Sequence, residues 1–197
     1  MSEELRARLC EKGDLDDIMA LQDAVFCSIG ENANILRRNT EETFLRCMSA
    51  GNITIGVFDG GILAGVAIME DARGRDDDLG IRLKTPVPEE YADMKLVMLR
   101  REYYGRGLQR KLMTILEKLA YMSGYRVFCT SVAPDNSYSR DNMIRLGYEY
   151  DSSMALYGGL ARDIFVKRLT MTEDEAEMLR DAASTEEALQ ILWDLYR

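Results

Sequence analysis

A chain of 197 residues with 47% hydrophobic and 30% charged side chains can bury one sizeable core and is ordinary for a soluble globular protein. Acidic residues outnumber basic ones by 34 to 25, which gives a formal net charge of −9. This balance argues against a nucleic-acid partner, because binding to phosphates requires clustered Lys and Arg.

Neither a membrane contact nor a metal site is expected. No apolar run approaches the roughly 20 residues that span a bilayer, and the acidic start at residues 2–4 is unlike a signal peptide. Cys10, Cys27, Cys47 and Cys129 have no metal-ligand spacing, and the chain contains no His. We expect a cytoplasmic protein with reduced, mostly buried thiols, in which a carboxylate, Tyr, Lys, Cys or water transfers protons.

The first part of the chain contains both strand and helix patterns. Residues 5–10 alternate as a strand does, and Asp14 is placed as the N-cap of an amphipathic helix. Thr40 caps a second helix. Residues 53–58 and 62–69 surround a glycine turn and predict a hairpin.

Residues 71–93 are predicted to form a long loop, because they contain two glycines, two prolines and three consecutive Asp at 76–78. Loops of this length often cover a binding site. The acidic run could attract a cationic acceptor, but a run of charges is usually solvated, and we infer no substrate from it.

The elements expected after this loop are a strand over 94–101, a helix over 107–123, a strand over 125–132, a short helix over 136–146, and strands over 148–156 and 164–169. The helix between the first two strands is a crossover, which makes those strands parallel neighbours. The order predicts an α/β (α+β) fold.

The last 27 residues differ from the rest in charge. They carry eight acidic side chains against two basic ones, and two capping boxes, Thr172 with Glu175 and Ser184 with Glu187, predict two small helices. We therefore divide the chain into a domain over 1–170 and an acidic helical extension over 171–197. The apolar face of the extension is expected to dock either on its own domain or on a second copy, as a homodimer.

The turn over residues 104–109 is the strongest functional signal. It joins a strand to a helix, so the first amides of the helix are unpaired and favour an anion. Gly105 and Gly107 let a pyrophosphate approach the backbone, and Arg106, Arg110 and Lys111 add positive charge at the same end of the helix. The alternative is a tight turn with solvated basic residues.

This turn resembles that of the GNAT superfamily of acyl-CoA-dependent N-acetyltransferases. The family's first invariant glycine aligns with Gly107, while Tyr104 replaces its usual Gln or Arg and Gln109 replaces a small residue. A second family segment follows, whose matching residues are Asn136, Ser139, Leu146, Gly147 and Tyr148.

The resemblance implies a mixed, mostly antiparallel twisted sheet, flanked by helices, whose central parallel pair is splayed to admit acetyl-CoA. Backbone groups of Leu99 and Arg101 would pair with pantetheine, and Asn136 and Ser139 would line the thioester end. The residues implied in acetyl-CoA binding are Leu99, Arg101, Tyr104, Gly105, Arg106, Gly107, Leu108, Gln109, Arg110, Asn136 and Ser139.

The catalytic residues depart from the family pattern. In much of the family a Tyr protonates the leaving thiolate, but Met143 stands at that position, so Tyr138 is the substitute candidate. Glu70 and Asp93 become neighbours if strand 62–69 pairs antiparallel to strand 94–101, and adjacent carboxylates raise one pKa toward that of a general base. The alternative to these catalytic roles is that Tyr138 only packs in its helix and that the two acids are ordinary residues at strand ends.

The expected function is transfer of acetyl from acetyl-CoA to a primary amine of a small molecule or peptide by direct attack. A non-catalytic acyl-CoA binding or sensing module is the second hypothesis. A third is another nucleotide-binding α/β protein.

Overall fold

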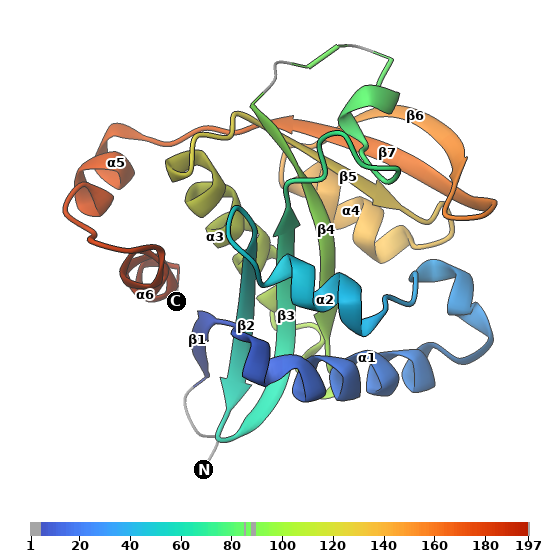
Figure 1. The fold of residues 1–197 in the computed structure, drawn as a ribbon, viewed down its shortest axis with the longest axis horizontal. Coiled ribbons are helices and arrows are strands. Elements are labelled where there is room, and N and C mark those ends of the chain that lie inside the picture. Colours follow the sequence, from blue (N-terminus) through green and yellow to red (C-terminus); the bar gives the residue numbers. More distant parts are fainter. Residues whose placement is uncertain (1–4, 85, 88–89, 197) are drawn as a thin grey trace.

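The computed structural model of the chain describes residues 5–84, 86–87 and 90–196. One seven-stranded sheet runs through the molecule, with the strand order β1-β2-β3-β4-β5-β7-β6 (Figure 1). Its strands are β1 (Arg6–Leu9), β2 (Ile53–Asp59), β3 (Ile62–Glu70), β4 (Tyr91–Leu99), β5 (Val127–Val132), β6 (Glu149–Leu156) and β7 (Leu160–Arg168). All neighbouring strands are antiparallel except β4 and β5, which are parallel. The predicted mixed, mostly antiparallel sheet is confirmed.

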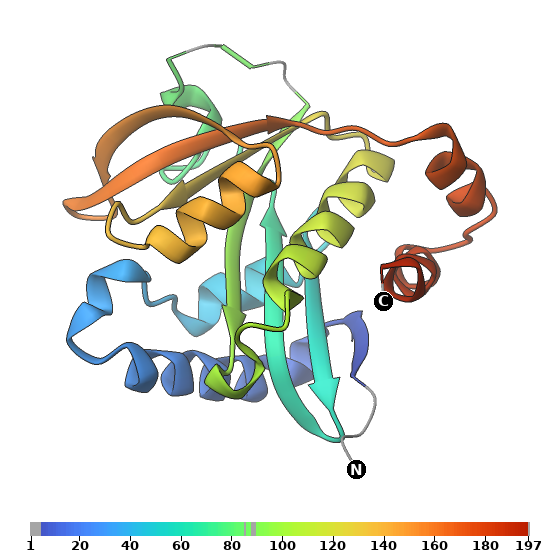
Figure 2. The same cartoon turned by 180° about the vertical axis from the view of Figure 1, so that it is seen from behind.

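Helices cover both faces of the sheet. The α-helices are α1 (Leu15–Ile29), α2 (Glu41–Cys47), α3 (Leu108–Met122), α4 (Ser137–Arg145), α5 (Glu173–Leu179) and α6 (Thr185–Leu195). Short 3-10 helices are η1 (Lys12–Asp14), η2 (Gly30–Ile35), η3 (Gly80–Arg82) and η4 (Arg101–Tyr103). Helices α1 and α2 lie on one face, and α3 and α4 lie on the other (Figures 1 and 2). In this three-layer arrangement both faces of the central strands are buried.

Helix α3 is set by an amphipathic pattern and by a glycine at each end. Its buried side includes Leu112, Ile115 and Leu116, each with no exposed surface, and burying one such side chain contributes roughly 1.5–3 kcal/mol. Gly107 before the helix and Gly124 after it have φ values of 73° and 95°, in the left-handed region that favours glycine. The predicted start and end of this helix agree with the structure to within a residue.

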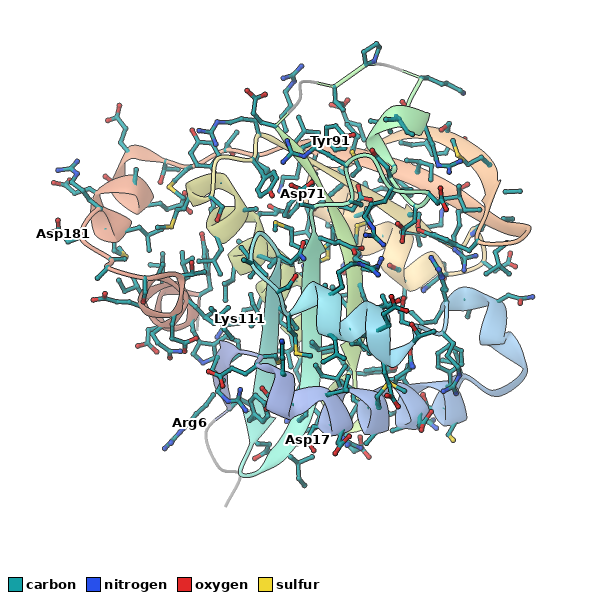
Figure 3. The ribbon with its side chains drawn as sticks, viewed as in Figure 1. Arg6, Asp17, Asp71, Tyr91, Lys111 and Asp181 are labelled. Atoms are coloured by element: carbon teal, nitrogen blue, oxygen red, sulfur yellow. The ribbon has the colours of Figure 1, made fainter. Side chains whose placement is uncertain are left out.

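Strand β4 begins at Tyr91 and not at residue 94, so the predicted loop over 71–93 was too long. Its acidic run is a solvated charge only in part, because Asp76 is exposed whereas Asp78 has no exposed surface. The Asp78 carboxylate accepts hydrogen bonds from the Tyr91 hydroxyl at 2.9 Å, from the Gly74 amide at 2.9 Å and from the Gly80 amide at 3.0 Å. These bonds hold the loop onto the sheet. Tyr91 lies at the end of the sheet that this loop covers (Figure 3).

The C-terminal helices pack on their own domain. Three side chains of α6 satisfy backbone groups at the open edge of the sheet: Glu186 accepts from the Leu9 amide at 2.8 Å, Gln190 donates to the Ala7 carbonyl at 2.7 Å, and Trp193 donates to the Leu5 carbonyl at 3.2 Å. The edge of β1 is thereby closed without another strand.

Trp193 also fixes α6 against α3. The Lys111 ammonium lies 3.4 Å from the centroid of the Trp193 ring, between α3 and α6 (Figure 3). The prediction that Lys111 adds charge to the glycine turn is therefore wrong, because it faces the C-terminal helix. Leu189 and Leu192 of α6 have no exposed surface and belong to the core that α3 forms with the sheet.

We predict that Trp193→Ala lowers the free energy of unfolding by about 3–5 kcal/mol, because it leaves a cavity and a backbone carbonyl without its donor. Urea unfolding followed by circular dichroism measures the change. The control is Leu195→Ala on the same helix, whose side chain is 43% exposed and whose loss should change stability by less than about 1 kcal/mol. Equal effects of the two variants would show that α6 is not docked as described.

Candidate functional site

Strands β4 and β5 share three residue pairs and then part. The last pair is Asp93 with Cys129; beyond it β4 continues to Leu99 and β5 to Val132 with no register between them. At the fork, the Thr130 hydroxyl donates to the Met94 carbonyl at 2.9 Å, which satisfies one of the backbone groups that the separation leaves without a partner strand. The predicted splayed parallel pair is confirmed.

A bulge in β4 accompanies the separation. The register between β3 and β4 pairs Ile68 with Leu96 and Met69 with Met94, so Lys95 is the extra residue. A bulge bends its strand and increases the local twist. It therefore helps β4 turn away from β5, and it brings Lys95 to the wall of the opening.

The opening between the strands is reached from both faces of the sheet. A cavity of about 100 Å3 is lined by Met113 and Met143 on the α3 and α4 side, and by Leu36 on the side of α1 and α2. A larger groove of about 360 Å3 adjoins it and extends along β4 to the glycine turn. We call these the inner cavity and the outer groove. The residues that line both are Ile35, Leu36, Val97, Gln109, Asn136 and Ser139.

The glycine turn ends the outer groove. Gly105 and Gly107 have φ values of 74° and 73°, and no side chain caps the start of α3. None of the described residues accepts a hydrogen bond from the backbone amides of residues 105–110. The Tyr103 hydroxyl donates to Asp59 at 2.7 Å, which ties the turn to the hairpin of β2 and β3. The unpaired amides and the dipole of α3 favour an anion at this point.

The predicted binding residues divide into those that line the groove and those that do not. Leu99, Tyr104, Gly105, Gly107, Leu108, Gln109, Asn136 and Ser139 line it. Arg101 and Arg110 are exposed outside that lining, and the Arg101 carbonyl already accepts from the Tyr104 amide at 3.1 Å. The Arg106 guanidinium lies 5.2 Å from the centroid of the Tyr103 ring, beside the turn.

Two of the lining side chains have structural partners. The Asn136 side chain caps α4 by accepting a hydrogen bond from the Ser139 amide at 3.1 Å. Gln109, which stands where a small residue was expected, accepts from the Asn142 side-chain amide at 2.9 Å. The larger side chain thus joins α3 to α4 along the wall of the opening.

Glu70 and Asp93 are cross-strand partners, as the antiparallel pairing predicted. The Glu70 carboxylate is 1% exposed and is bound by Arg46 at 2.6 Å and by Lys95. In Asp93, Oδ2 accepts from the Leu79 amide at 3.3 Å, while Oδ1 is buried without a partner. Burial raises the pKa of the Asp93 carboxyl well above its ordinary value, and the nearby Asp78 adds to the rise.

Neither carboxylate lines the inner cavity, but Lys95 does. Its ammonium contacts Glu70 and, at 3.1 Å, Asp77. Burial lowers the pKa of Lys95, yet these two carboxylates outweigh it and leave the pKa above its ordinary value. Lys95 is therefore a charged wall residue that connects Glu70 to the opening.

The two positions at which a proton donor for the thiolate would be expected lie at different depths. Tyr138 is 57% exposed and lines the outer groove, whereas Met143, at the family's Tyr position, lines the inner cavity. Ser131 also lines the inner cavity, and its Oγ lies 3.2 Å from the Tyr157 hydroxyl in the turn between β6 and β7. Sequence reasoning missed Ser131, Thr130 and Lys95, although adjacent Thr and Ser in an otherwise apolar strand were a visible signal.

Within the described part of the chain, every helix is too short or too polar to span a bilayer. The same residues include no group of three or more Cys, Asp or Glu side chains that could hold a metal ion. Cys10, Cys47 and Cys129 are buried free thiols, while Cys27 is exposed.

No family model and no curated protein matches the chain. Solved structures match it over most of their length. A Salmonella typhimurium protein described as an acetyltransferase, with its cofactor acetyl-CoA, is 20% identical, with 86% of this chain and 96% of that one covered at a TM-score of 0.65. The ribosomal-protein-S18-alanine N-acetyltransferase of Escherichia coli is 15% identical, and the match covers 87% of this chain and 97% of that one at a TM-score of 0.63.

A GNAT-family acetyltransferase of Streptococcus pneumoniae is 21% identical, covering 85% of this chain and all of its own at a TM-score of 0.62. The chain therefore has the GNAT acetyltransferase fold. The likeness is one of backbone arrangement.

We predict that Asp93 makes the protein less stable as pH rises. The unfolded carboxyl loses its proton near pH 4, whereas the buried one keeps it to higher pH. Between these two pKa values the folded state holds the extra proton, so stability falls by up to about 1.4 kcal/mol per pH unit. Asp93→Asn removes this loss, so its stability relative to the parent should rise with pH in urea unfolding from pH 4 to 8.

The matched control is Asp76→Asn at an exposed position in the loop between β3 and β4, and its stability should run parallel to that of the parent at every pH. A pH-independent difference between Asp93→Asn and the parent would mean that Asp93 is ionised throughout.

Proposed function

We propose that this chain is an acetyl-CoA-dependent N-acetyltransferase that transfers acetyl to a primary amine of a small molecule or peptide. The observation that carries the proposal is the separation of β4 from β5 next to a turn whose amides, over residues 105–110, have no described acceptor. One structural neighbour carries acetyl-CoA as its cofactor. A groove and a cavity connect the turn to the fork of the strands.

The residues present fit an elongated ligand with an anionic centre. The amides of residues 105–110 would hold the pyrophosphate, and Arg106 and Arg110 would add positive charge beside it. The backbone of β4 up to Leu99 would pair with the amide groups of pantetheine, because the edge of β4 that faces β5 has no partner strand there. Asn136 and Ser139, which line both spaces, would flank the thioester end.

The chemistry expected at the inner cavity is direct attack of a neutral amine on the thioester carbonyl carbon. The C–N bond forms as the C–S bond breaks, and the amine gives up a proton. We assign the role of general base to Asp93, acting through water, because its Oδ1 has no partner and burial raises its pKa. Both oxygens of Glu70 are held by cations, so Glu70 positions Lys95.

The departing thiolate needs a proton. Tyr138 was the sequence candidate, but it lines only the outer groove, whereas Ser131 lines the inner cavity and contacts the Tyr157 hydroxyl. We therefore favour the Ser131 and Tyr157 pair over Tyr138 as the source. Because a thiol of this kind has a pKa of about 8.5, protonation by water would also suffice.

The enzymatic proposal predicts that free thiol is released when the protein is mixed with acetyl-CoA and a panel of amines that includes diamines, amino acids and short peptides. A thiol reagent follows the release, and mass spectrometry identifies the acetylated product. Binding of acetyl-CoA by calorimetry, with no thiol release from any amine, would instead support the non-catalytic binding module. Competition by ATP or NAD would favour a different nucleotide-binding protein.

A second prediction concerns the turn. We expect Gly107→Ala to weaken acetyl-CoA binding by about tenfold, which corresponds to about 1.4 kcal/mol, because the left-handed φ of 73° is costly for alanine and the amides must reorient. Calorimetry measures the dissociation constant. Gly124→Ala places the same strain at the other end of α3, where φ is 95°, and should leave the affinity unchanged. Equal losses in both variants would point to helix α3 as a whole.

A further inference from the structure

Arg162 of β7 is a buried cation without an anionic partner. It is 4% exposed; its Nη1 donates to the Ala161 carbonyl at 2.7 Å, and its Nη2 is buried with no hydrogen-bond partner. No described carboxylate lies within ion-pair distance of it. Leaving a charge buried and unpaired is costly, so such groups normally pair with another charge.

The other cations of this region are already paired. Arg140 binds Asp163, the residue next to Arg162 on β7, and the Lys95 ammonium binds Glu70. The Arg37 guanidinium lies 3.7 Å from Asp77. Arg162 therefore differs from these neighbours in having no carboxylate partner among the described residues, and burial lowers its pKa.

Arg162 lies beside the inner cavity. In the register of β5 with β7, Ser131 pairs with Ile164, so the side chains of Ser131 and Arg162 lie on the same face of the sheet, in neighbouring diagonal positions. Ser131 lines the inner cavity. Arg162 is thus a diagonal cross-strand neighbour of Ser131, and Ser131 lines the cavity where the acceptor amine would meet the thioester.

Tyr157 connects Ser131 to a second guanidinium. Its hydroxyl lies 3.2 Å from the Ser131 Oγ, and the Arg37 guanidinium lies 4.4 Å from the centroid of its ring. Tyr157 also has a φ of 52°, the left-handed conformation that residues other than glycine rarely adopt. Such strain is concentrated at binding and catalytic sites.

From this arrangement we infer that the acceptor is a small primary amine that carries a carboxylate, and that Arg162 binds this carboxylate. The inference rests on the proposed acetyltransferase function and names its substrate class. A guanidinium is suited to the task because its parallel N–H groups match the two oxygens of a carboxylate. The Nη2 atom is buried without a hydrogen-bond partner, so a side chain that covers it must move before the carboxylate binds. The amine then points toward the inner cavity.

The experiment compares amines that differ only in the carboxylate, namely L-amino acids and their amides, each with acetyl-CoA. We expect kcat/KM at least tenfold higher for the acids in the parent protein. Arg162→Gln should raise KM for the acids at least tenfold and leave KM for the amides and the affinity for acetyl-CoA unchanged. Arg162→Lys should recover part of the preference. Arg168→Gln, an exposed position on the same strand, is the matched control and should behave as the parent.

A stability measurement separates recognition from a structural role. Because Arg162 has no partner for its charge, Arg162→Met should raise the thermal unfolding midpoint, by about 2–4 °C, while it abolishes the preference for the acids. A fall in the midpoint together with equal losses for acids and amides would show that Arg162 supports the fold, and would overturn the inference.

The remaining outcomes distinguish the two proposals. Turnover of amides or diamines at rates equal to those of the acids would overturn the carboxylate inference and leave the transferase function standing. Acetyl-CoA binding without turnover of any amine would overturn the transferase function. Calorimetry of the same amino acids with the acetyl-CoA complex then decides the inference: binding that Arg162→Gln weakens supports a carboxylate site, and no binding overturns it.

Discussion

Strands β4 and β5 pair over only three residue pairs, and beyond them the edge of each strand that faces the other has no partner strand. Buried peptide groups left unpaired are expensive, so the rest of the molecule has to hold the two strands apart. The apolar surface of α3 contributes on one face, because it packs across β2, β3 and β4. Thr130 satisfies the first unpaired carbonyl of β4, and the bulge at Lys95 starts the bend.

The same separation explains why the polar groups around the fork are so firmly bound to each other. Glu70 and Lys95 form an ion pair at the bulge, and Asp77 joins them from the loop after β3. Asp78 of that loop gathers four donors, including the Tyr91 hydroxyl at the start of β4. The loop therefore acts as a brace for the paired end of the two strands, at the point where the opening begins.

Sequence patterns predicted the parts of the fold that depend on local chemistry. The glycines at 105 and 107, the apolar stripe of α3 and the capping boxes of the tail each act over a few residues, and the structure has the expected turn and helices. The adjacency of Glu70 and Asp93 also followed from strand pairing alone.

The failures involve residues whose environment is assembled from distant segments. Lys111 contacts Trp193 across 82 positions of sequence, and no local pattern indicates that contact. Asp78 looks like part of a solvated acidic run until the loop folds back onto Tyr91. In the sequence, Arg162 resembles an ordinary polar residue of a strand, and its lack of a carboxylate partner is a property of the folded environment of β7.

The opening at the fork is bounded by two groups of segments that are far apart in the chain. The turn after β4 and the first turns of α3 and α4 form one wall, while η2 and the residue after it line the other and the turn between β6 and β7 lies close by. Substitutions can therefore accumulate around η2 and the turn between β6 and β7 without disturbing the hydrogen-bond geometry of the wall formed by the turn after β4, α3 and α4. Such a division lets a lineage change its choice of acceptor while keeping the same acyl donor, so paralogues with this fold should diverge first around η2 and Tyr157.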